Sequence, residues 1–388
     1  MDILLINPPD TTALDSEMDP PFNLMMIAAA LKKHGITSQI AELCKGIPDN
    51  IPLAKMYGIT VTTATYTSGE QVSTAIRSKY PEAKIVVGGS HTFGLDVEYA
   101  DLTISGRCLG NVHELLSLNG HHRGVQCLNN GYPLPWNLVT LRPYKRYVPE
   151  ATSTLSYITS IGCPFNCKFC CNYYNKQPYD VISQKSFIRD MDILIRDKLI
   201  DGINFMDDNF LLRMDLLNII SRYNIKWRAM VPSSGTFNYS DLYKSGCRYL
   251  VIGIESGSKR MLSLMNKQQG DIHAIVNKAN DAGIGVRGLF MVGYPGETWE
   301  SVEETATLIK ALPLDSISIH LFTPFPGTDP YHNPDKYGIT WISGDFDLFR
   351  SHPVDGILRP VFSTNALSTK TLVEMHTYLE SVKSTESM

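Results

Sequence analysis

The sequence lacks any run of about 18 apolar residues, which a transmembrane helix requires. The opening residues, MDILLINPP, also lack the basic region and cleavage site of a signal peptide, so we expect a cytoplasmic protein and no membrane partner. Charge of one sign is not in excess, because 35 Lys and Arg oppose 39 Asp and Glu for a net charge of -4. Bulk binding of nucleic acid is therefore not indicated.

Repeats and low-complexity tracts are absent as well. Hydrophobic residues make up 43% of the 388 residues and charged residues 19%, which is typical of globular proteins and excludes disordered or fibrous classes for most of the chain. A disulfide framework is also missing. Four of the eight cysteines fall between residues 163 and 171, whereas Cys44, Cys108, Cys127 and Cys247 are scattered. This distribution favours a metal site in a reducing compartment.

The N-terminal third alternates short apolar strands with helices. Strands separated by helices, with Gly or Pro at the turns, predict an α/β domain with a doubly wound, Rossmann-like parallel sheet over residues 1–128. Gly46, Pro48 and Pro52 leave space for at most one short helical turn between the second and third strands. We expect strands at 3–7, 38–43, 58–63, 84–87 and 102–105, and helices at 24–34, 69–80 and 111–118.

A second alternating series follows an irregular stretch. Residues 129–152 are rich in proline and aromatic residues and are interpreted as a linker packed across a domain boundary. Six strand–helix units over 153–330 predict a partial (β/α)6 barrel, because eight units would be needed for closure. The extension over 331–388 is expected to form a short C-terminal α segment with a helix at 368–383. The barrel strands are expected at 155–161, 202–206, 226–231, 249–254, 286–292 and 316–322, with helices including 183–198, 211–223, 239–245 and 272–282.

Three closely spaced cysteines follow the first barrel strand. Cys163, Cys167 and Cys170 supply soft thiolate ligands, which suit zinc or an iron–sulfur cluster. Structural zinc sites usually combine two ligand pairs, and no second pair lies in the usual window. Three ligands instead leave one iron of a [4Fe-4S] cluster open to a small chelating molecule. Cys171 is expected to pack or face away, with a role as substitute ligand or substrate contact as the alternative.

The CxxxCxxC spacing, with Phe169 before the last cysteine, resembles the radical S-adenosylmethionine (SAM) superfamily. The resemblance implies that Cys163, Cys167 and Cys170 bind a [4Fe-4S] cluster whose open iron holds the amino and carboxyl groups of SAM. Reduction by a donor such as flavodoxin or ferredoxin would then split SAM into methionine and a 5'-deoxyadenosyl radical. That radical removes a hydrogen atom from the substrate.

Later strand ends carry further motifs of this family in the expected order. The segment FMDDNF resembles the contact to the SAM amino group, GIESGS resembles the ribose contact, and the ends of the fifth and sixth strands resemble backbone contacts to the cofactor. The cofactor-binding residues that the resemblance implies in the barrel are Phe169, Asp207, Asp208, Glu255, Ser256, Gly293, Leu321 and Pro324.

The N-terminal segment resembles the cobalamin-binding domain of one radical SAM subgroup, on the motifs NPP, GITVTTATYTSGEQV and IVVGGSHT. The motif DxHxxG is absent, so no histidine is expected as the lower axial ligand. The subgroup's GEGE motif is replaced by Gly-Arg-Cys-Leu at 106–109, and the domain could keep the fold without the ligand. The cobalamin contacts that the resemblance implies are Thr63, Thr65, Tyr66, Thr67, Gly88, Gly89, Ser90 and His91.

Three functions remain open at this point. The first is a radical SAM methyltransferase that transfers a methyl group through cobalamin to carbon of a small-molecule or nucleoside-type substrate. The second is a cobalamin-independent rearrangement, elimination or oxidation with a ligand-free N-terminal domain. The third, in another class, is a non-catalytic zinc-binding module. Methylthiolation of transfer RNA is disfavoured, because neither three N-terminal cluster cysteines nor a basic C-terminal domain is evident.

No catalytic residue is assigned. We expect the substrate to enter between the two domains. Cys247 and His320 are interpreted as packing residues, with a cavity-facing role as the alternative. The positions expected near the entrance are Tyr144–Tyr147, Tyr173, Tyr174, Arg228 and Trp341–Phe349.

Overall fold

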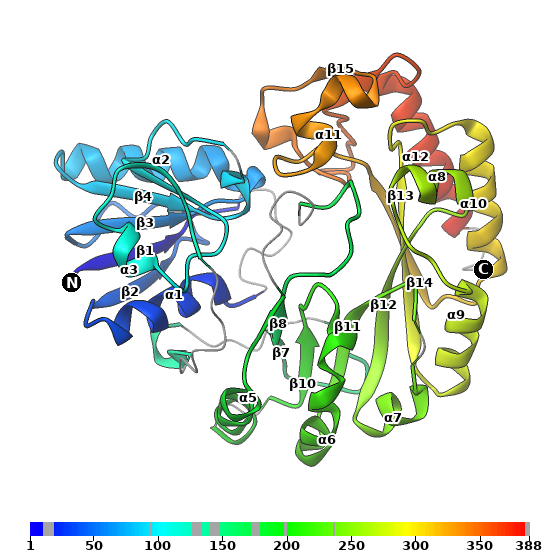
Figure 1. Cartoon of the computed structure of the whole chain (residues 1–388), viewed down its shortest axis with the longest axis horizontal. Coiled ribbons are helices and arrows are strands. Elements are labelled where there is room, and N and C mark those ends of the chain that lie inside the picture. Colours follow the sequence, from blue (N-terminus) through cyan, green and yellow to red (C-terminus); the bar gives the residue numbers. More distant parts are fainter. Residues whose placement is uncertain are drawn as a thin grey trace.

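Two six-stranded parallel sheets dominate the computed structural model (Figure 1). The structure describes residues 1–10, 19–93, 95–125, 134–139, 147–171, 179–197, 200–235 and 237–384. The N-terminal sheet has the strand order β2-β1-β3-β4-β5-β6, and the second sheet has the order β14-β13-β12-β11-β10-β7. The predicted α/β class, with a doubly wound sheet followed by a six-stranded partial barrel, is confirmed.

The N-terminal sheet is covered by helices on both faces. Alternate residues of one strand point to opposite faces, so Ile3 packs with α1 and α3, whereas Leu4 packs with α2. As predicted, no helix lies between β2 and β3. The strands are β1 (Ile3–Asn7), β2 (Ser38–Glu42), β3 (Met56–Thr60), β4 (Lys84–Gly88), β5 (Leu102–Ser105) and β6 (Gly120–Arg123), and the helices are α1 (Phe22–Lys33), α2 (Tyr66–Lys79) and α3 (Val112–Leu115).

Strand β6 was not predicted. Its sequence, Gly-His-His-Arg, contains no β-branched residue, and it forms a strand only by pairing with β5 at the sheet edge. Strand β3 ends at Thr60, three residues before the predicted end. The following threonines therefore leave the sheet edge and form the 3₁₀ turn η1 (Thr63–Thr65).

The second sheet curls and does not close, with β7 and β14 at its two ends. Helices cover its outer side, and its inner side faces the viewer in Figure 1 over β10 to β12. The strands are β7 (Thr154–Tyr157), β10 (Gly202–Phe205), β11 (Lys226–Pro232), β12 (Cys247–Glu255), β13 (Gly285–Val292) and β14 (Ser316–Leu321). The helices include α5 (Gln184–Met191), α6 (Leu217–Ile220), α7 (Tyr239–Lys244), α8 (Lys259–Leu264), α9 (Ile272–Asp281) and α10 (Trp299–Ala311).

Three barrel elements differ from the prediction. The first strand is split, because β8 (Ser160–Ile161) leaves the barrel and pairs with β9 (Asp180–Val181). The predicted helix at 183–198 is α5 followed by a π-helical turn at Asp192–Asp197. The predicted helix at 211–223 is mostly 3₁₀, because Arg213 leaves helical geometry and turns its guanidinium inward.

The C-terminal extension contains more than the predicted helix. Helix α12 (Thr369–Ser384) contacts α10 and β14, and β15 (Ile339–Ile342) pairs with β16 (Phe362–Thr364) in an antiparallel hairpin. The short turn η8 (Phe346–Leu348) reaches the N-terminal sheet, where it contacts η1 and α2. The extension therefore touches both halves of the molecule, and its hairpin lies above the barrel in Figure 1.

The described part of the segment interpreted as a linker packs between the two sheets. The ring of Trp136 lies 5.9 Å from Phe22 of α1 and 6.3 Å from Tyr157 of β7 between ring centroids. Buried side chains of both sheets consequently join one hydrophobic core. Among the described residues, no helix is long and apolar enough to cross a membrane.

Candidate active site

The cysteine loop starts directly after β8 and is held by the turn that follows α8. Gly162 has φ +98° and turns the chain away from β8. The backbone N–H of Lys168 donates to Met265 O at 3.0 Å, and Asn266 Nδ2 donates to Asn166 O at 2.9 Å. These contacts hold the middle of the loop against the barrel.

The thiols of the loop are partly accessible. Cys163, Cys167 and Cys170 are each half-buried and form no disulfide. Burial raises the pKa of the Cys163 and Cys167 thiols, and the ammonium group of Lys267 opposes this rise for both. The described residues contain no group of three or more His, Cys, Asp or Glu arranged to hold a metal ion.

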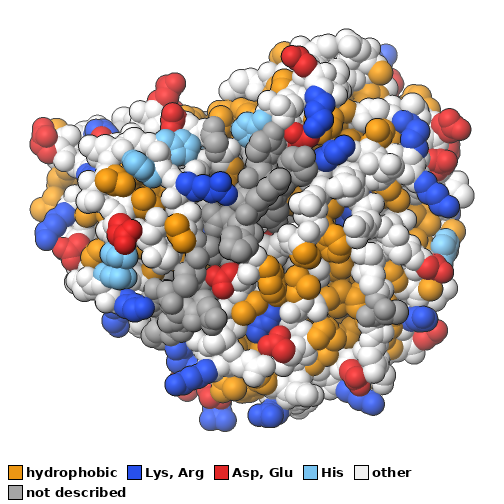
Figure 2. Space-filling model, in the orientation of Figure 1, with side chains coloured by type: hydrophobic (Ala, Val, Ile, Leu, Met, Phe, Trp, Pro, Cys, Tyr) orange, Lys and Arg blue, Asp and Glu red, His pale blue; other side chains and the backbone are white. Residues whose placement is uncertain are grey.

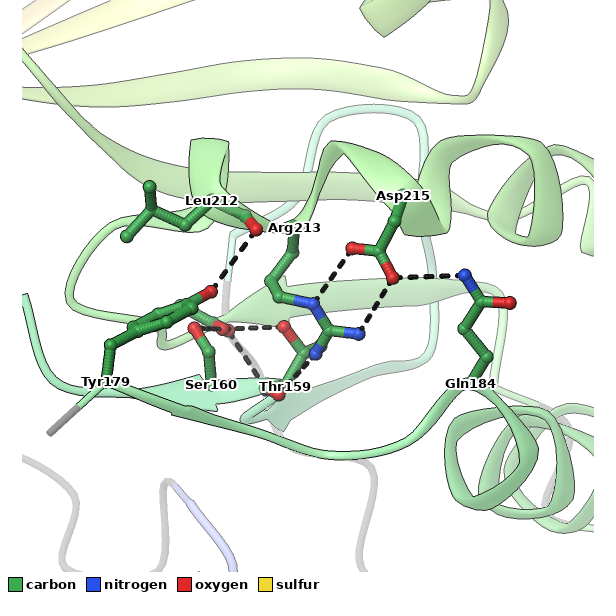
Figure 3. A network of polar contacts seen from close by, with 8 residues as sticks. Thr159, Ser160, Tyr179, Gln184, Leu212, Arg213 and Asp215 are labelled. Atoms are coloured by element: carbon green, nitrogen blue, oxygen red, sulfur yellow. Dashed lines mark hydrogen bonds and ion pairs between the residues drawn. The ribbon is translucent and has the colours of Figure 1, made fainter. Parts of the chain in front are cut away.

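Asp207 is buried and contacts Thr159 and Ser160, which belong to the polar network with Arg213 and Asp215 that Figure 3 shows. Its carboxylate accepts hydrogen bonds from the Thr159 backbone N–H at 3.1 Å, from Thr159 Oγ1 at 2.6 Å and from the Ser160 hydroxyl. Arg213, which is 2% exposed, donates to Thr159 O and pairs with Asp215 at 3.0 Å. Burial raises the pKa of Asp207. With its carboxylate engaged by Thr159 and Ser160, Asp207 fixes the strand end before Cys163 and does not face a ligand.

Asp208 points the other way. One of its oxygens accepts from Gly162 N at 2.9 Å, and Arg107 Nη2 of the N-terminal half lies 3.8 Å from the same oxygen. Asp208 lines a cavity together with Cys170 and Cys171. Of the two predicted carboxylates, the second therefore faces the site.

Glu255 occupies a bulge at the end of β12, where its φ of +67° is unusual for a residue with a side chain. Its carboxylate pairs with Lys267 Nζ at 3.2 Å, and both side chains are nearly buried. Lys267 thus pairs with the predicted ribose contact, and its charge also acts on the thiols of Cys163 and Cys167. Lys267, which lies twelve residues after Glu255, was missed in the sequence.

Four of the other predicted contacts serve packing in this structure. Ser256 is buried, and its hydroxyl accepts from Ser258 N at 3.1 Å. Gly293 N donates to the carboxylate of Glu297 at 3.3 Å, and a Cβ on this glycine would meet Leu372 at 2.6 Å. Leu321 and Pro324 are buried at the end of β14. Only backbone groups of these residues are available for cofactor contact, apart from Phe169, whose ring is half-buried.

A cavity of about 480 Å³ lies between the N-terminal sheet and the cysteine loop. Gly88, Gly89 and Ser90 line it at the strand ends, and Cys170, Cys171 and Asp208 line the opposite wall. Its depth is an apolar slot between the sheet and helices α1 and α3. The slot and its rim include Ile3, Leu5, Asn23, Leu24, Ile27, Gly58, Thr60, Val86, Ile104, Arg107, Cys108, Val112 and Leu116.

The hydroxyl-rich segment and His91 do not line this cavity. His91 is 1% exposed and packs between Tyr66 at 4.6 Å and Phe346 at 4.5 Å, measured between ring centroids. Its Nδ1 lies 3.3 Å from Thr63 Oγ1, and burial lowers its pKa to about 4. The hydroxyl-rich segment leaves the sheet because β3 ends early. Its residues lie in η1 and at the start of α2, and they are Thr63, Thr65, Tyr66 and Thr67.

The other sequence-based expectations have varied outcomes. Cys171 lines the cavity, with its thiol 3.7 Å from Pro326 O, rather than facing away. Cys247 is fully buried, as expected of a packing residue. Arg228 Nη1 donates to Tyr147 O at 3.1 Å on the inner side of the barrel. Tyr144, Tyr173 and Tyr174 lie outside the described residues.

Comparison with known proteins identifies the class. Residues 157–309 match the sequence profile of the Radical SAM superfamily. A protein described as an uncharacterized methyltransferase from Pyrococcus horikoshii is 28% identical over 84% of this chain and 82% of its own length. The bacteriochlorophyllide d C-12(1)-methyltransferase of Chlorobaculum tepidum is 24% identical over 84% and 77%, respectively.

The fold is also similar to a solved structure over nearly the whole chain. The radical SAM methyltransferase TsrM from Kitasatospora setae, solved with cobalamin and a [4Fe-4S] cluster, has a TM-score of 0.73 at 17% identity and covers 98% of this chain and 91% of its own. The resemblance stated from the motifs is thus confirmed. This chain contains a radical SAM domain over residues 157–309 and is an enzyme.

Proposed function

We propose that this protein is a cobalamin-dependent methyltransferase that uses SAM and a [4Fe-4S] cluster to methylate carbon of a small-molecule substrate. The observation that carries the proposal is the shared cavity. It joins the strand ends of the N-terminal sheet to Cys170 on the cysteine loop and to Asp208, which follows β10. A group bound along the sheet edge would therefore lie next to a group bound at the loop.

The donor set fits a cluster with one open iron. The three thiols lie on one short loop, and no fourth protein ligand is needed when a small molecule chelates the last iron. When bound, the cluster supplies the electron that splits SAM, and cobalamin carries the methyl group. Asp208 is oriented by Gly162 N and would accept from the ammonium group of SAM.

Glu255 and Lys267 provide charges of both signs next to the cysteines. Glu255 would accept hydrogen bonds from the ribose hydroxyls, whereas the ammonium of Lys267 would pair with the carboxylate of SAM. Both side chains are nearly buried, and the ion pair between them, at 3.2 Å, holds them in place. The protein thereby orients a zwitterionic ligand without using Asp207.

The apolar slot fits a flat nucleotide base of cobalamin. Gly58 lines the slot, and a Cβ at this position would meet Leu5 Cδ2 at 3.0 Å and Ile3 Cδ1 at 3.4 Å. Gly89, with φ +121°, brings the backbone close at the mouth, where its own Cβ would meet Val61 O at 2.2 Å. Apolar walls and a narrow rim of backbone N–H groups are features of cofactor sites.

Retention of cobalamin tests the proposal. The protein is reconstituted anaerobically with iron and sulfide, mixed with hydroxocobalamin and desalted, and its absorption spectrum is recorded. We expect stoichiometric corrin bands for the unchanged protein and strongly reduced bands for Gly58→Val, because the added methyl groups fill the slot. Gly344→Val, in open space, is the matched control and should retain cobalamin.

A ligand-free N-terminal half is the alternative. Absence of corrin bands from a preparation with a full complement of iron would refute methyl transfer through cobalamin. The reaction would then be a rearrangement, elimination or oxidation, identified by 5'-deoxyadenosine without S-adenosylhomocysteine. A cytoplasmic location and a flavodoxin or ferredoxin as electron donor complete the proposal. The donor is tested by adding reduced flavodoxin or ferredoxin to the reconstituted protein and measuring the cleavage of SAM.

A further inference from the structure

The inner face of the barrel sheet carries a positive charge that the proposed cofactors do not use. On β13, Val286 and Phe290 are buried toward the helices, whereas Arg287 and Leu289 alternate with them and are partly exposed on the inner side. Arg287 lies opposite Val251 of β12 and Ser316 of β14 in the strand register. It therefore stands in the lower half of the barrel, below the level of Glu255.

The guanidinium of Arg287 points toward the carboxyl ends of the strands. Its Nε donates to Ser318 Oγ at 3.1 Å, and its Nη2 also donates to this hydroxyl. Ser318 lies two residues beyond Ser316, the register partner of Arg287. The cysteine loop follows the strand ends on the same side, so the side chain is directed at the region where the chemistry would occur.

Arg287 has no carboxylate partner within ion-pair distance among the described residues. On the neighbouring elements, Glu255 is paired with Lys267, and the Asp315 carboxylate accepts from Val286 N at 2.6 Å. His320, the next inward residue on β14 after Ser318, lies 3.2 Å from Ser351 Oγ. The serine hydroxyl engages the Nε side of the guanidinium, which leaves the Nη1 and Nη2 edge to present two parallel N–H groups.

An apolar surface lies beside this charge. Met230 of β11 is 42% exposed, and Met206, just after β10, is 43% exposed. The residue that follows each of them in the sequence is buried. Figure 2 shows hydrophobic side chains gathered over the inner side of β10 to β12. Unbranched methionine side chains adapt to ligands of different shape.

We propose that Arg287 binds a carboxylate of the substrate, whose apolar body lies on Met230 and Met206. The acceptor carbon would then be held toward the cysteine loop. This proposal rests on the proposed function, because it names the class of substrate for the same barrel. One guanidinium edge matches the geometry and single charge of a carboxylate. A phosphate dianion would call for more donors than this edge offers.

Binding of a simple acid to the apoprotein tests the proposal without any cofactor. Isothermal titration near neutral pH uses 4-phenylbutyrate, its neutral analogue 4-phenylbutanamide and inorganic phosphate as probes. We expect the acid to bind at millimolar concentration, and the amide to bind at least roughly tenfold more weakly, because it lacks the charge-assisted pair. Arg287→Met should weaken binding of the acid by a similar factor, whereas Arg222→Met, at an exposed arginine, should not.

Several results would overturn the proposal. These are equal binding of acid and amide, equal binding of the acid to wild type and Arg287→Met, no binding of the acid at millimolar concentration, and tighter binding of phosphate than of the acid. Cleavage of SAM without substrate keeps the two proposals separate. If Arg287→Met folds correctly it cleaves SAM like wild type, so loss of acid binding with intact cleavage concerns Arg287 alone. Ser318→Ala provides a second variant, in which Arg287 remains but is no longer oriented, and acid binding should weaken less.

Discussion

Replacement of Asp207 should disconnect the cysteine loop from the barrel. In Asp207→Ala, the Thr159 N–H and the hydroxyls of Thr159 and Ser160 lose a shared acceptor in a region where these residues are at most 1% exposed. An unsatisfied buried donor costs about 1–3 kcal/mol. The hydroxyls can rotate to other acceptors, whereas the amide cannot. We therefore expect Asp207→Ala to lower the free energy of unfolding by about 3 kcal/mol.

Asp207→Asn should lower the free energy of unfolding by less, about 1–2 kcal/mol, because the asparagine side chain keeps one acceptor oxygen. Burial raises the pKa of Asp207, which means that the folded protein disfavours the charge itself and that the acceptor oxygens matter more. Arg213 remains paired with Asp215 in both variants, so no isolated buried charge results. The order of stability should be wild type, then Asp207→Asn, then Asp207→Ala.

Urea unfolding of the apoprotein and iron content after anaerobic reconstitution are the two measurements. We expect Asp207→Ala to unfold at lower urea and to bind less iron, since β8 leads directly into Cys163. Asp281→Ala, at an exposed residue at the end of α9, is the matched control and should change neither. An Asp207→Ala protein with wild-type stability, or one that is destabilised yet incorporates full iron, would refute a positioning role for Asp207.

Two further predictions concern the cysteines and Glu297. Cys163→Ala, Cys167→Ala and Cys170→Ala should each abolish formation of 5'-deoxyadenosine from SAM, whereas Cys171→Ala should preserve it; full activity in any of the first three would exclude the assigned ligand set. Burial raises the pKa of Glu297 to about 7 from 4.5, so the folded state holds a proton that the unfolded state has released. Its contribution to stability is thus complete below about pH 4.5 and is lost as the pH rises to about 7, a change of about 3 kcal/mol. The free energy of unfolding of Glu297→Gln should not show this fall between about pH 4.5 and 7, because glutamine does not titrate. Parallel pH profiles of wild type and Glu297→Gln would contradict the raised pKa of Glu297.

The sequence predicted the parallel sheets because their determinants are local. Alternating apolar strands and helices with Gly or Pro between them need no long-range information, and the six barrel strands followed directly. The cysteine spacing is likewise local and identified the superfamily. Edge strand β6 and the hairpin of β15 and β16 were missed, because pairing rather than composition makes them strands.

The assignment of individual side chains depended on tertiary structure. The FMDDNF motif has two adjacent carboxylates, but successive residues after a strand point in opposite directions, so that Asp207 enters the core and Asp208 faces the cavity. The threonines after β3 were expected at the cavity, and the early end of that strand moved them beneath η8.

Sequence alone thus determined the fold class, because periodicity along the chain encodes it, whereas the spacing of Cys163, Cys167 and Cys170 predicts them as the thiol ligands. Only the tertiary structure decided which polar groups meet. The cavity joins the strand end at Gly88, Gly89 and Ser90 to Cys170, at least 80 residues later in the sequence, and Lys267 pairs with Glu255 across a helix. The inward charge of Arg287 becomes evident only when the register places it opposite Ser316, where its guanidinium donates to Ser318 and has no described carboxylate within ion-pair distance. Such contacts depend on packing between distant segments, which no local pattern specifies.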